Sequence, residues 1–154
     1  MRALQVAALS DPDPFRRAGY LALLDHIAND ASTDVFATAL RDPVAGVRRH
    51  AVHGLTCERC RSTEVCVTDV VPAVIAALAD EPAAEIRHQL VVVLGQFVTR
   101  SEVARRTLQE VATSDPDRLL RQAATAVLTN GHTRSRKALE RLERSATRRS
   151  VDLR

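Results

Sequence analysis

The chain has 154 residues, a formal net charge of +3 and 45% hydrophobic residues, while aromatic residues make up only 3%. A chain of this length can form one domain with a hydrophobic core. It has no run of the ~20 apolar residues that a membrane-spanning helix needs, and Asp11 and Asp13 interrupt the first apolar run too early for a signal peptide. We therefore expect a cytoplasmic protein with no membrane association.

From the N-terminus onward, one pattern of residues recurs four times. Each copy has an acidic residue followed by proline, an arginine five residues after the proline, and a leucine seven residues after the arginine. The copies are Asp11, Pro12, Arg17 and Leu24; Asp42, Pro43, Arg48 and Leu55; Glu81, Pro82, Arg87 and Leu94; and Asp115, Pro116, Arg121 and Leu128. The prolines are 43 − 12 = 31, 82 − 43 = 39 and 116 − 82 = 34 residues apart, which is typical of stacked repeats.

An acidic residue before proline favours a turn that opens a helix, because the carboxylate caps backbone N–H groups and proline is tolerated in the first turn. We expect second helices over residues 14–26, 44–56, 83–96 and 117–129. Apolar runs over residues 3–9, 35–40, 70–79 and 103–112 predict the first helices. Val47, Ala51 and Leu55 recur at four-residue steps and predict a buried face. The fold class is therefore all-α, a single domain over residues 1–146 with repeats over about 1–30, 31–66, 67–99 and 100–131.

This pattern resembles the HEAT-like repeat family, whose units carry an aspartate or Asp-Pro turn, then an arginine, then small residues and leucine in the second helix. The resemblance covers most of residues 1–131. It implies a right-handed α-solenoid whose second helices line a concave surface. Such repeats serve as protein-binding scaffolds and also as DNA-repair glycosylases, so the resemblance implies a fold rather than one function.

The arginines of the pattern are expected to be structural. In a stacked array each can pair with the acidic turn residue of a neighbouring repeat, and the pairs would form a ladder along the turns. The predicted ladder consists of Asp11, Arg17, Asp42, Arg48, Glu81, Arg87, Asp115 and Arg121. Neighbouring basic residues are freer to bind a partner, which we expect to be anionic. These candidates are Arg16, Arg49, His50, His88 and Arg118.

All three cysteines lie together, close to two histidines. His53, Cys57 and Cys60 fall on one side of a continuing helix, and Cys66 follows in a polar segment, residues 59–69, that lengthens the second repeat. Thiolates and imidazoles are the ligands that zinc prefers, and Cys-x2-Cys presents two sulfurs to one ion. We therefore predict a structural zinc site with His53, Cys57, Cys60 and Cys66 as ligands and His50 as the alternative histidine. The other interpretations are inert thiols, and a redox pair or iron–sulfur use.

The basic character of the chain comes from its C-terminal segment. Residues 132–154 hold 8 basic and 3 acidic side chains, whereas residues 1–131 hold 14 and 16. Apolar residues at helical spacing predict a capping helix over residues 133–146, followed by a basic tail over residues 147–154. The alternative is an arm that binds nucleic acid or an acidic partner.

The candidate zinc site is closed and therefore structural, and the sequence has neither a glycine-rich phosphate loop nor a nucleophile elbow. We therefore predict a non-enzymatic scaffold that binds a protein partner. One alternative is a nucleic-acid binder similar to HEAT-like DNA glycosylases, against which stands the single Tyr20 with no tryptophan to stack on a base. The other is a redox sensor in which oxidation of the cysteines releases zinc.

Overall fold

The computed structural model describes residues 1–27, 30–56 and 67–130. Within these residues every regular element is an α-helix, so the predicted all-α class is confirmed for the described chain. The predicted capping helix over residues 133–146 and the basic tail over residues 147–154 lie outside the described residues. No helix in the described ranges is both long and apolar enough to cross a membrane.

Eight helices follow one another in the described chain. They are α1 (Arg2–Ser10), α2 (Pro14–Ile27), α3 (Asp30–Ala39), α4 (Ala45–Thr56), α5 (Val67–Asp80), α6 (Ala84–Gln96), α7 (Glu102–Ser114) and α8 (Arg118–Asn130). The even-numbered helices match the predicted second helices to within one residue at each end. Each acidic residue and proline pair lies just before one of them, as the capping argument requires.

Two first helices begin earlier than their apolar runs indicate. The helix α3 begins at Asp30, because the polar side chains of Ser32 and Thr33 are buried in its first turns rather than exposed in a loop. The helix α5 begins at Val67, so the last three residues of the segment expected to be a loop, residues 59–69, are helical instead. Apolar periodicity alone misses such starts, because a helix can bury polar residues against its neighbours.

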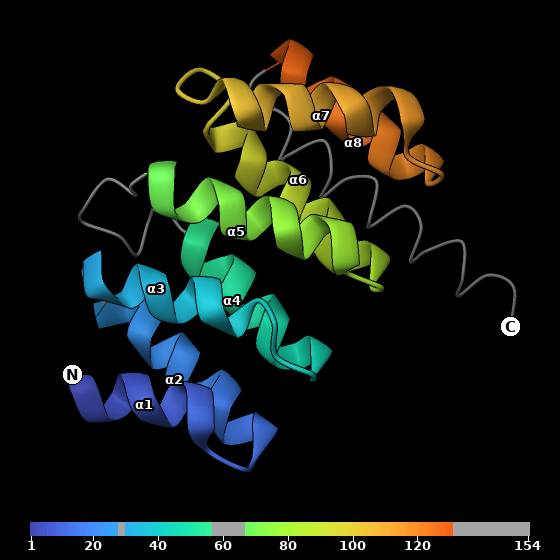
Figure 1. Cartoon of the computed structure of the whole chain (residues 1–154). Helices are drawn as coiled ribbons and strands as arrows, with labels where there is room; N and C mark the ends of the chain where they lie inside the picture. Colours follow the sequence, from blue (N-terminus) through green and yellow to red (C-terminus); the bar gives the residue numbers. More distant parts are fainter. Residues whose placement is uncertain (28–29, 57–66, 131–154) are drawn as a thin grey trace, which may run out of the picture.

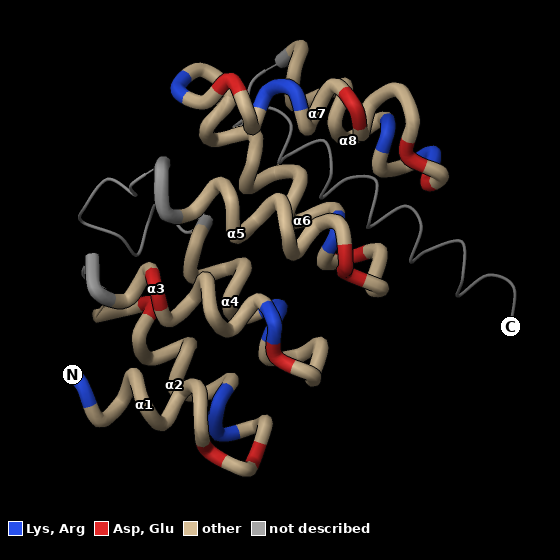
Figure 2. Tube along the Cα trace, in the orientation of Figure 1, with Lys and Arg blue, Asp and Glu red and all other residues tan. Residues whose placement is uncertain are grey.

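The helices form four antiparallel pairs that stack in order (Figure 1). Each odd-numbered helix packs against the even-numbered helix that follows it. In addition, α1, α3, α5 and α7 contact one another in sequence, and so do α2, α4, α6 and α8. The chain therefore has two layers of helices. The turns within the pairs, each between an odd-numbered helix and the even-numbered helix that follows it, gather along one edge of the stack, where Figure 2 shows acidic and basic residues side by side.

The core runs between the two layers. The predicted apolar face is confirmed in α4, where Val47, Ala51 and Leu55 are almost completely buried. Gly54 lies against the ring of Phe36, so closely that a Cβ atom at this position would overlap the ring. Small residues therefore let the helices of a pair approach each other, in agreement with a composition rich in alanine and poor in aromatic residues.

Candidate functional site

Arginines join the acidic turns of successive repeats. The Nε and Nη2 atoms of Arg17 donate hydrogen bonds to the Asp42 carboxylate over 2.7 and 3.0 Å. Arg48 donates in the same way to Glu81 over 2.7 Å from each atom, and Arg87 pairs with Asp115. In each case the arginine contacts the acid of the following repeat. We call Arg17–Asp42, Arg48–Glu81 and Arg87–Asp115 the arginine ladder; two of its three pairs are bidentate, the strongest geometry for such a contact.

The third nitrogen of the guanidinium, Nη1, forms a hydrogen bond within the turn of the arginine's own repeat. Nη1 of Arg17 donates to the backbone carbonyl of Asp11 over 2.7 Å, and Nη1 of Arg48 donates to the carbonyl of Asp42 over 2.9 Å. Arg121 makes the equivalent bond to the carbonyl of Asp115. One arginine side chain thus donates hydrogen bonds both to the turn of its own repeat and to the turn of the next repeat. The fixed arrangement of several N–H donors on a guanidinium allows this, which explains why arginine rather than lysine occupies the position.

The ladder acids also shape their own turns. Oδ1 of Asp42 accepts a hydrogen bond from the backbone N–H of Val44 over 2.8 Å, and Oε1 of Glu81 accepts one from Ala83 over 3.0 Å. The bonded N–H belongs to the residue after the proline, because proline itself has no N–H to donate. Each carboxylate therefore satisfies a free backbone donor at the start of a helix and an arginine at the same time.

These contacts keep the ladder acids ionised. Burial is the largest single influence on Asp42 and Glu81 and favours their neutral forms. The hydrogen bonds and positive charges of Arg17 and Arg48, together with the backbone N–H groups, outweigh burial and lower the pKa of both acids. The same hydrogen bonds raise the pKa values of Arg17 and Arg48.

The ends of the predicted ladder differ from its middle. Arg121 makes no ion pair with another described residue, and neither does the Asp11 carboxylate, which accepts only the backbone N–H of Asp13 over 2.9 Å. Asp11 would need an arginine from a preceding repeat and Arg121 an acid from a following one. The structure therefore brings together six of the eight predicted ladder residues as pairs.

The basic residues expected to bind a partner lie in different surroundings. Arg16 and Arg118 are exposed, and Arg16 lies 3.9 Å from Asp13 of its own helix turn. Arg49 is also half exposed but donates to Glu85 of the next repeat over 2.8 Å. Arg49 therefore lies on the surface of the second helices as part of an ion pair.

His88 is not a free surface residue, contrary to the expectation for it. Only 11% of its side chain is exposed, and its Nε2 atom lies 3.5 Å from Oδ2 of Asp117 in the next repeat. Burial favours the neutral form of Asp117, but backbone N–H groups of Leu119 and Leu120 and the charge of His88 outweigh it and lower the pKa of Asp117. The stacking of α8 on α6 covers His88, and only the register between repeats could have predicted this burial.

The predicted metal ligands are described only in part, because Cys57, Cys60 and Cys66 lie outside the described residues. His53 occupies the last turn of α4, and its Nδ1 atom lies 4.0 Å from Oδ2 of Asp25 on α2. Within the described ranges, no group of three histidine, cysteine, aspartate or glutamate residues is arranged to hold a metal ion.

The alternative ligand His50 lies one turn before His53 on α4. Partial burial, followed by the positive charges of His53 and Arg49, lowers the pKa of His50, while the nearby Asp25 carboxylate opposes this effect. The neutral imidazole is the form that binds metal ions.

Asp25 is a candidate functional residue that the sequence pattern did not reveal. Only 9% of its side chain is exposed, and its Oδ1 atom has no hydrogen-bond partner among the described residues. It lies thirteen residues after the proline of its repeat, where the later repeats carry Thr56, Gly95 and Thr129. The sequence could have pointed to Asp25, because it places a carboxylate where the other repeats have a small residue or a residue with a hydroxyl group.

Comparisons of the chain with protein-family models, with curated proteins and with solved structures found no match. The resemblance to HEAT-like repeats therefore stands on the repeated residues themselves.

Proposed function

We propose that the chain is a short right-handed α-solenoid of HEAT-like repeats, which acts as a non-enzymatic scaffold and binds a protein partner. The observation that carries this proposal is the arginine ladder, which joins successive turns by the same contact at three boundaries. A contact repeated in this way sets the stacking of one repeat on the next. Arrays of stacked repeats present extended surfaces, and such surfaces are used to bind partners.

The second helices form the proposed binding surface. They contact one another in the order α2, α4, α6 and α8, so their outer sides form one continuous strip. Arg16, Arg49, His50 and Arg118 are exposed on these helices. We therefore propose an acidic protein segment as the partner, with Arg16 and Arg118 as its main contacts, because Arg49 already shares its charge with Glu85. His88 contributes no contact, because the stacking covers it.

This proposal can be tested by capture of partners from the native cell extract on the immobilised full chain. We expect the double variant Arg16→Glu/Arg118→Glu to lose the captured partner, because its charge opposes an acidic segment. The matched control is Arg105→Glu/Arg106→Glu, which reverses two exposed charges on a first helix, α7. Equal loss of the partner with both double variants would contradict a binding surface on the second helices.

We also propose that a structural zinc ion is held by His53, Cys57, Cys60 and Cys66. Two described features support the proposal. His53 lies in the last turn of α4, four residues before Cys57 in the sequence, and the Asp25 carboxylate lies 4.0 Å from its Nδ1 atom. A carboxylate behind a histidine ligand is a common arrangement at zinc sites, where it orients the imidazole. Thiolate ligands persist in a reducing compartment, in agreement with a cytoplasmic protein.

A further inference from the structure

The first helix of the chain exposes a side whose counterpart in the third repeat faces the preceding repeat. Val6 and Ala7 lie six and five residues before the proline of their repeat, and Ala76 and Ala77 hold the same places in the third repeat. Ala76 and Ala77 line a groove together with Leu40 of the preceding repeat. In the first repeat no described helix precedes this side, and Val6 is 59% exposed.

The second helix of the first repeat shows the same feature. Leu23 lies eleven residues after the proline of its repeat, as Val127 does in the fourth. Val127 packs against Gly95 of the preceding second helix, so closely that a Cβ atom on Gly95 would overlap it, and Val127 is 1% exposed. Leu23, by contrast, is 55% exposed. Both helices of the first pair therefore present stacking positions without a described partner; we call this side of α1 and α2 the N-terminal end face (Figure 1).

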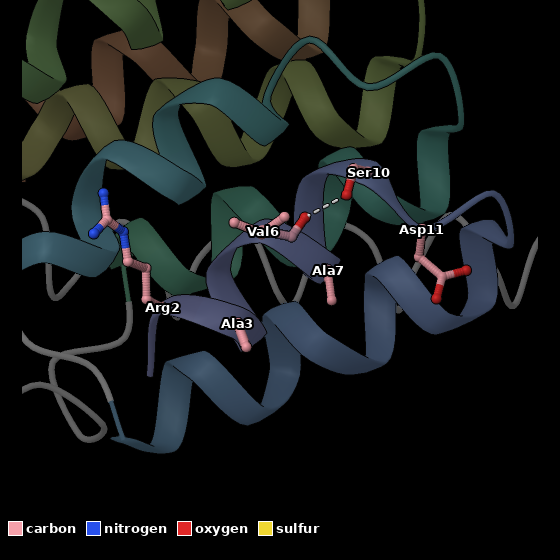
Figure 3. Close-up of a pocket in the computed structure, with 6 residues that line it drawn as sticks. All are labelled: Arg2, Ala3, Val6, Ala7, Ser10 and Asp11. Carbon is pink, nitrogen blue, oxygen red and sulfur yellow. Dashed lines mark hydrogen bonds between the residues drawn. The ribbon is translucent and has the colours of Figure 1, made fainter.

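The N-terminal end face carries two charges that match each other by symmetry. A shallow groove on α1 is lined by Arg2 at one end and Asp11 at the other, with Val6 between them (Figure 3). Neither Arg2 nor Asp11 forms an ion pair with another described residue. Nine positions along a helix correspond to about 14 Å at 1.5 Å per residue. The midpoint between the two charges falls between Val6 and Ala7, at the centre of the groove.

From this geometry we propose that two copies of the chain associate through their N-terminal end faces about a two-fold axis. The two α1 helices pack antiparallel, with Val6 and Ala7 at the axis. Arg2 of each copy then pairs with Asp11 of the other, so Asp11 receives from the second copy the type of contact that the other ladder acids receive within the chain. Leu23 extends the apolar contact beyond α1. Such an interface is isologous and closes at two copies.

One position on α8, in the last described repeat, favours this arrangement over head-to-tail stacking. The ninth residue after the proline is Leu21, Val52 and Val91 in the first three repeats, and all three are buried. In the last repeat this residue is Thr125, which is exposed. A polar residue at this position is a poorer complement to Leu23, whereas a second N-terminal end face matches Val6 and Leu23 in both apolar area and charge.

Sedimentation velocity of the full chain over roughly 1–200 µM tests the proposal. We expect a monomer–dimer equilibrium, and we expect Val6→Asp to be monomeric across the range, because it places two carboxylates at the axis. Val103→Asp is the matched control, since Val103 is 60% exposed on α7 at the far end of the stack. Val103→Asp should dimerise as the wild type does. A monomeric wild type, or a Val6→Asp variant that still dimerises, would overturn the proposal.

Charge reversal tests the symmetry of the contact. Arg2→Asp and Asp11→Arg should each weaken dimerisation roughly tenfold, because each removes two exposed ion pairs from the symmetric interface. The combined variant Arg2→Asp/Asp11→Arg should recover the wild-type affinity, since the exchanged charges again face each other. Failure of this recovery would overturn the pairing. Loss of association in Arg121→Glu, or assemblies that grow beyond two copies, would show head-to-tail stacking instead.

Discussion

Removal of Arg48 should cost more stability than any other change in the arginine ladder. The Glu81 side chain is 2% exposed and that of Arg48 is 12% exposed, and two hydrogen bonds of 2.7 Å join them. In Arg48→Ala the Glu81 carboxylate remains buried and keeps only the N–H of Ala83. Breaking a buried pair typically costs 3–5 kcal/mol, and access of water at the partly exposed arginine reduces this to about 2–4 kcal/mol.

Urea unfolding followed by circular dichroism at pH 7 measures this loss, which corresponds to a fall in Tm of about 5–15 °C for a chain of this size. Arg49→Ala is the matched control, because Arg49 is the next residue on α4 and its partner Glu85 is 53% exposed. We expect Arg49→Ala to cost at most about 1 kcal/mol. Equal losses in the two variants would refute the assignment of stability to the buried ladder.

A third variant distinguishes the cost of losing the contact between Arg48 and Glu81 from the cost of leaving the Glu81 carboxylate buried and unpaired. Arg48→Ala/Glu81→Gln removes the charge that Arg48→Ala leaves buried, so it should recover part of the stability lost in Arg48→Ala. No recovery at pH 7 would mean that the cost does not arise from an unpaired carboxylate.

Three further predictions concern acid sensitivity, close packing and metal content. The pKa values of Asp42 and Glu81 in the folded chain lie below their ordinary values of 3.8 and 4.5. The stability that the ladder contributes is therefore fully present above about pH 4.5 and is lost as the pH falls through the lower pKa values of the folded chain. Measurement of the unfolding free energy as a function of pH in the acid range tests this. Gly54→Ala should destabilise the chain through overlap with Phe36, whereas Gly46→Ala on the same helix, where nothing lies within 4 Å, should stabilise it by about 0.5–1 kcal/mol in the same urea assay. Elemental analysis should find about one zinc per chain, lost in Cys57→Ser, and a protein free of metal with reactive thiols would contradict the zinc proposal.

Local residue patterns predicted the helices and the core well. Proline and the acidic residue before it mark the starts of the second helices, and four-residue apolar steps mark the buried face of α4. These signals depend on contacts within one repeat. The start of α3 escaped prediction, because Ser32 and Thr33 look like loop residues in the sequence but are buried by tertiary packing.

Contacts between repeats were harder to predict, because they depend on the register of stacking. The repeated arginine indicated a pairing with a neighbouring turn, but only the structure shows that Arg48 contacts the following repeat rather than the preceding one. The contacts of Arg49 with Glu85 and of His88 with Asp117 follow the same direction. Each joins the sixth residue after one proline to an acidic residue after the next proline, the third residue for Glu85 and the first for Asp117. Knowledge of one such contact would have predicted which repeat the others reach, but not which acidic residue.

The two edges of the stack are held together differently. At the edge formed by the turns, the arginine ladder joins each pair of successive repeats through a hydrogen-bonded ion pair. Towards the ends of α2 and α4, the boundary between the first two repeats has Asp25 and His53 at 4.0 Å, and Oδ1 of the buried Asp25 accepts no hydrogen bond from a described residue. A buried acceptor without a partner costs about 1–3 kcal/mol. A metal ion on His53 would make the imidazole a stronger donor toward Oδ2 of Asp25, the oxygen near its Nδ1 atom, and would leave Oδ1 to find another donor. The proposed zinc site therefore lies away from the edge that carries the arginine ladder, and part of its effect on stability should come from the attraction between His53 on α4 and Asp25 on α2, in addition to ordering the cysteines.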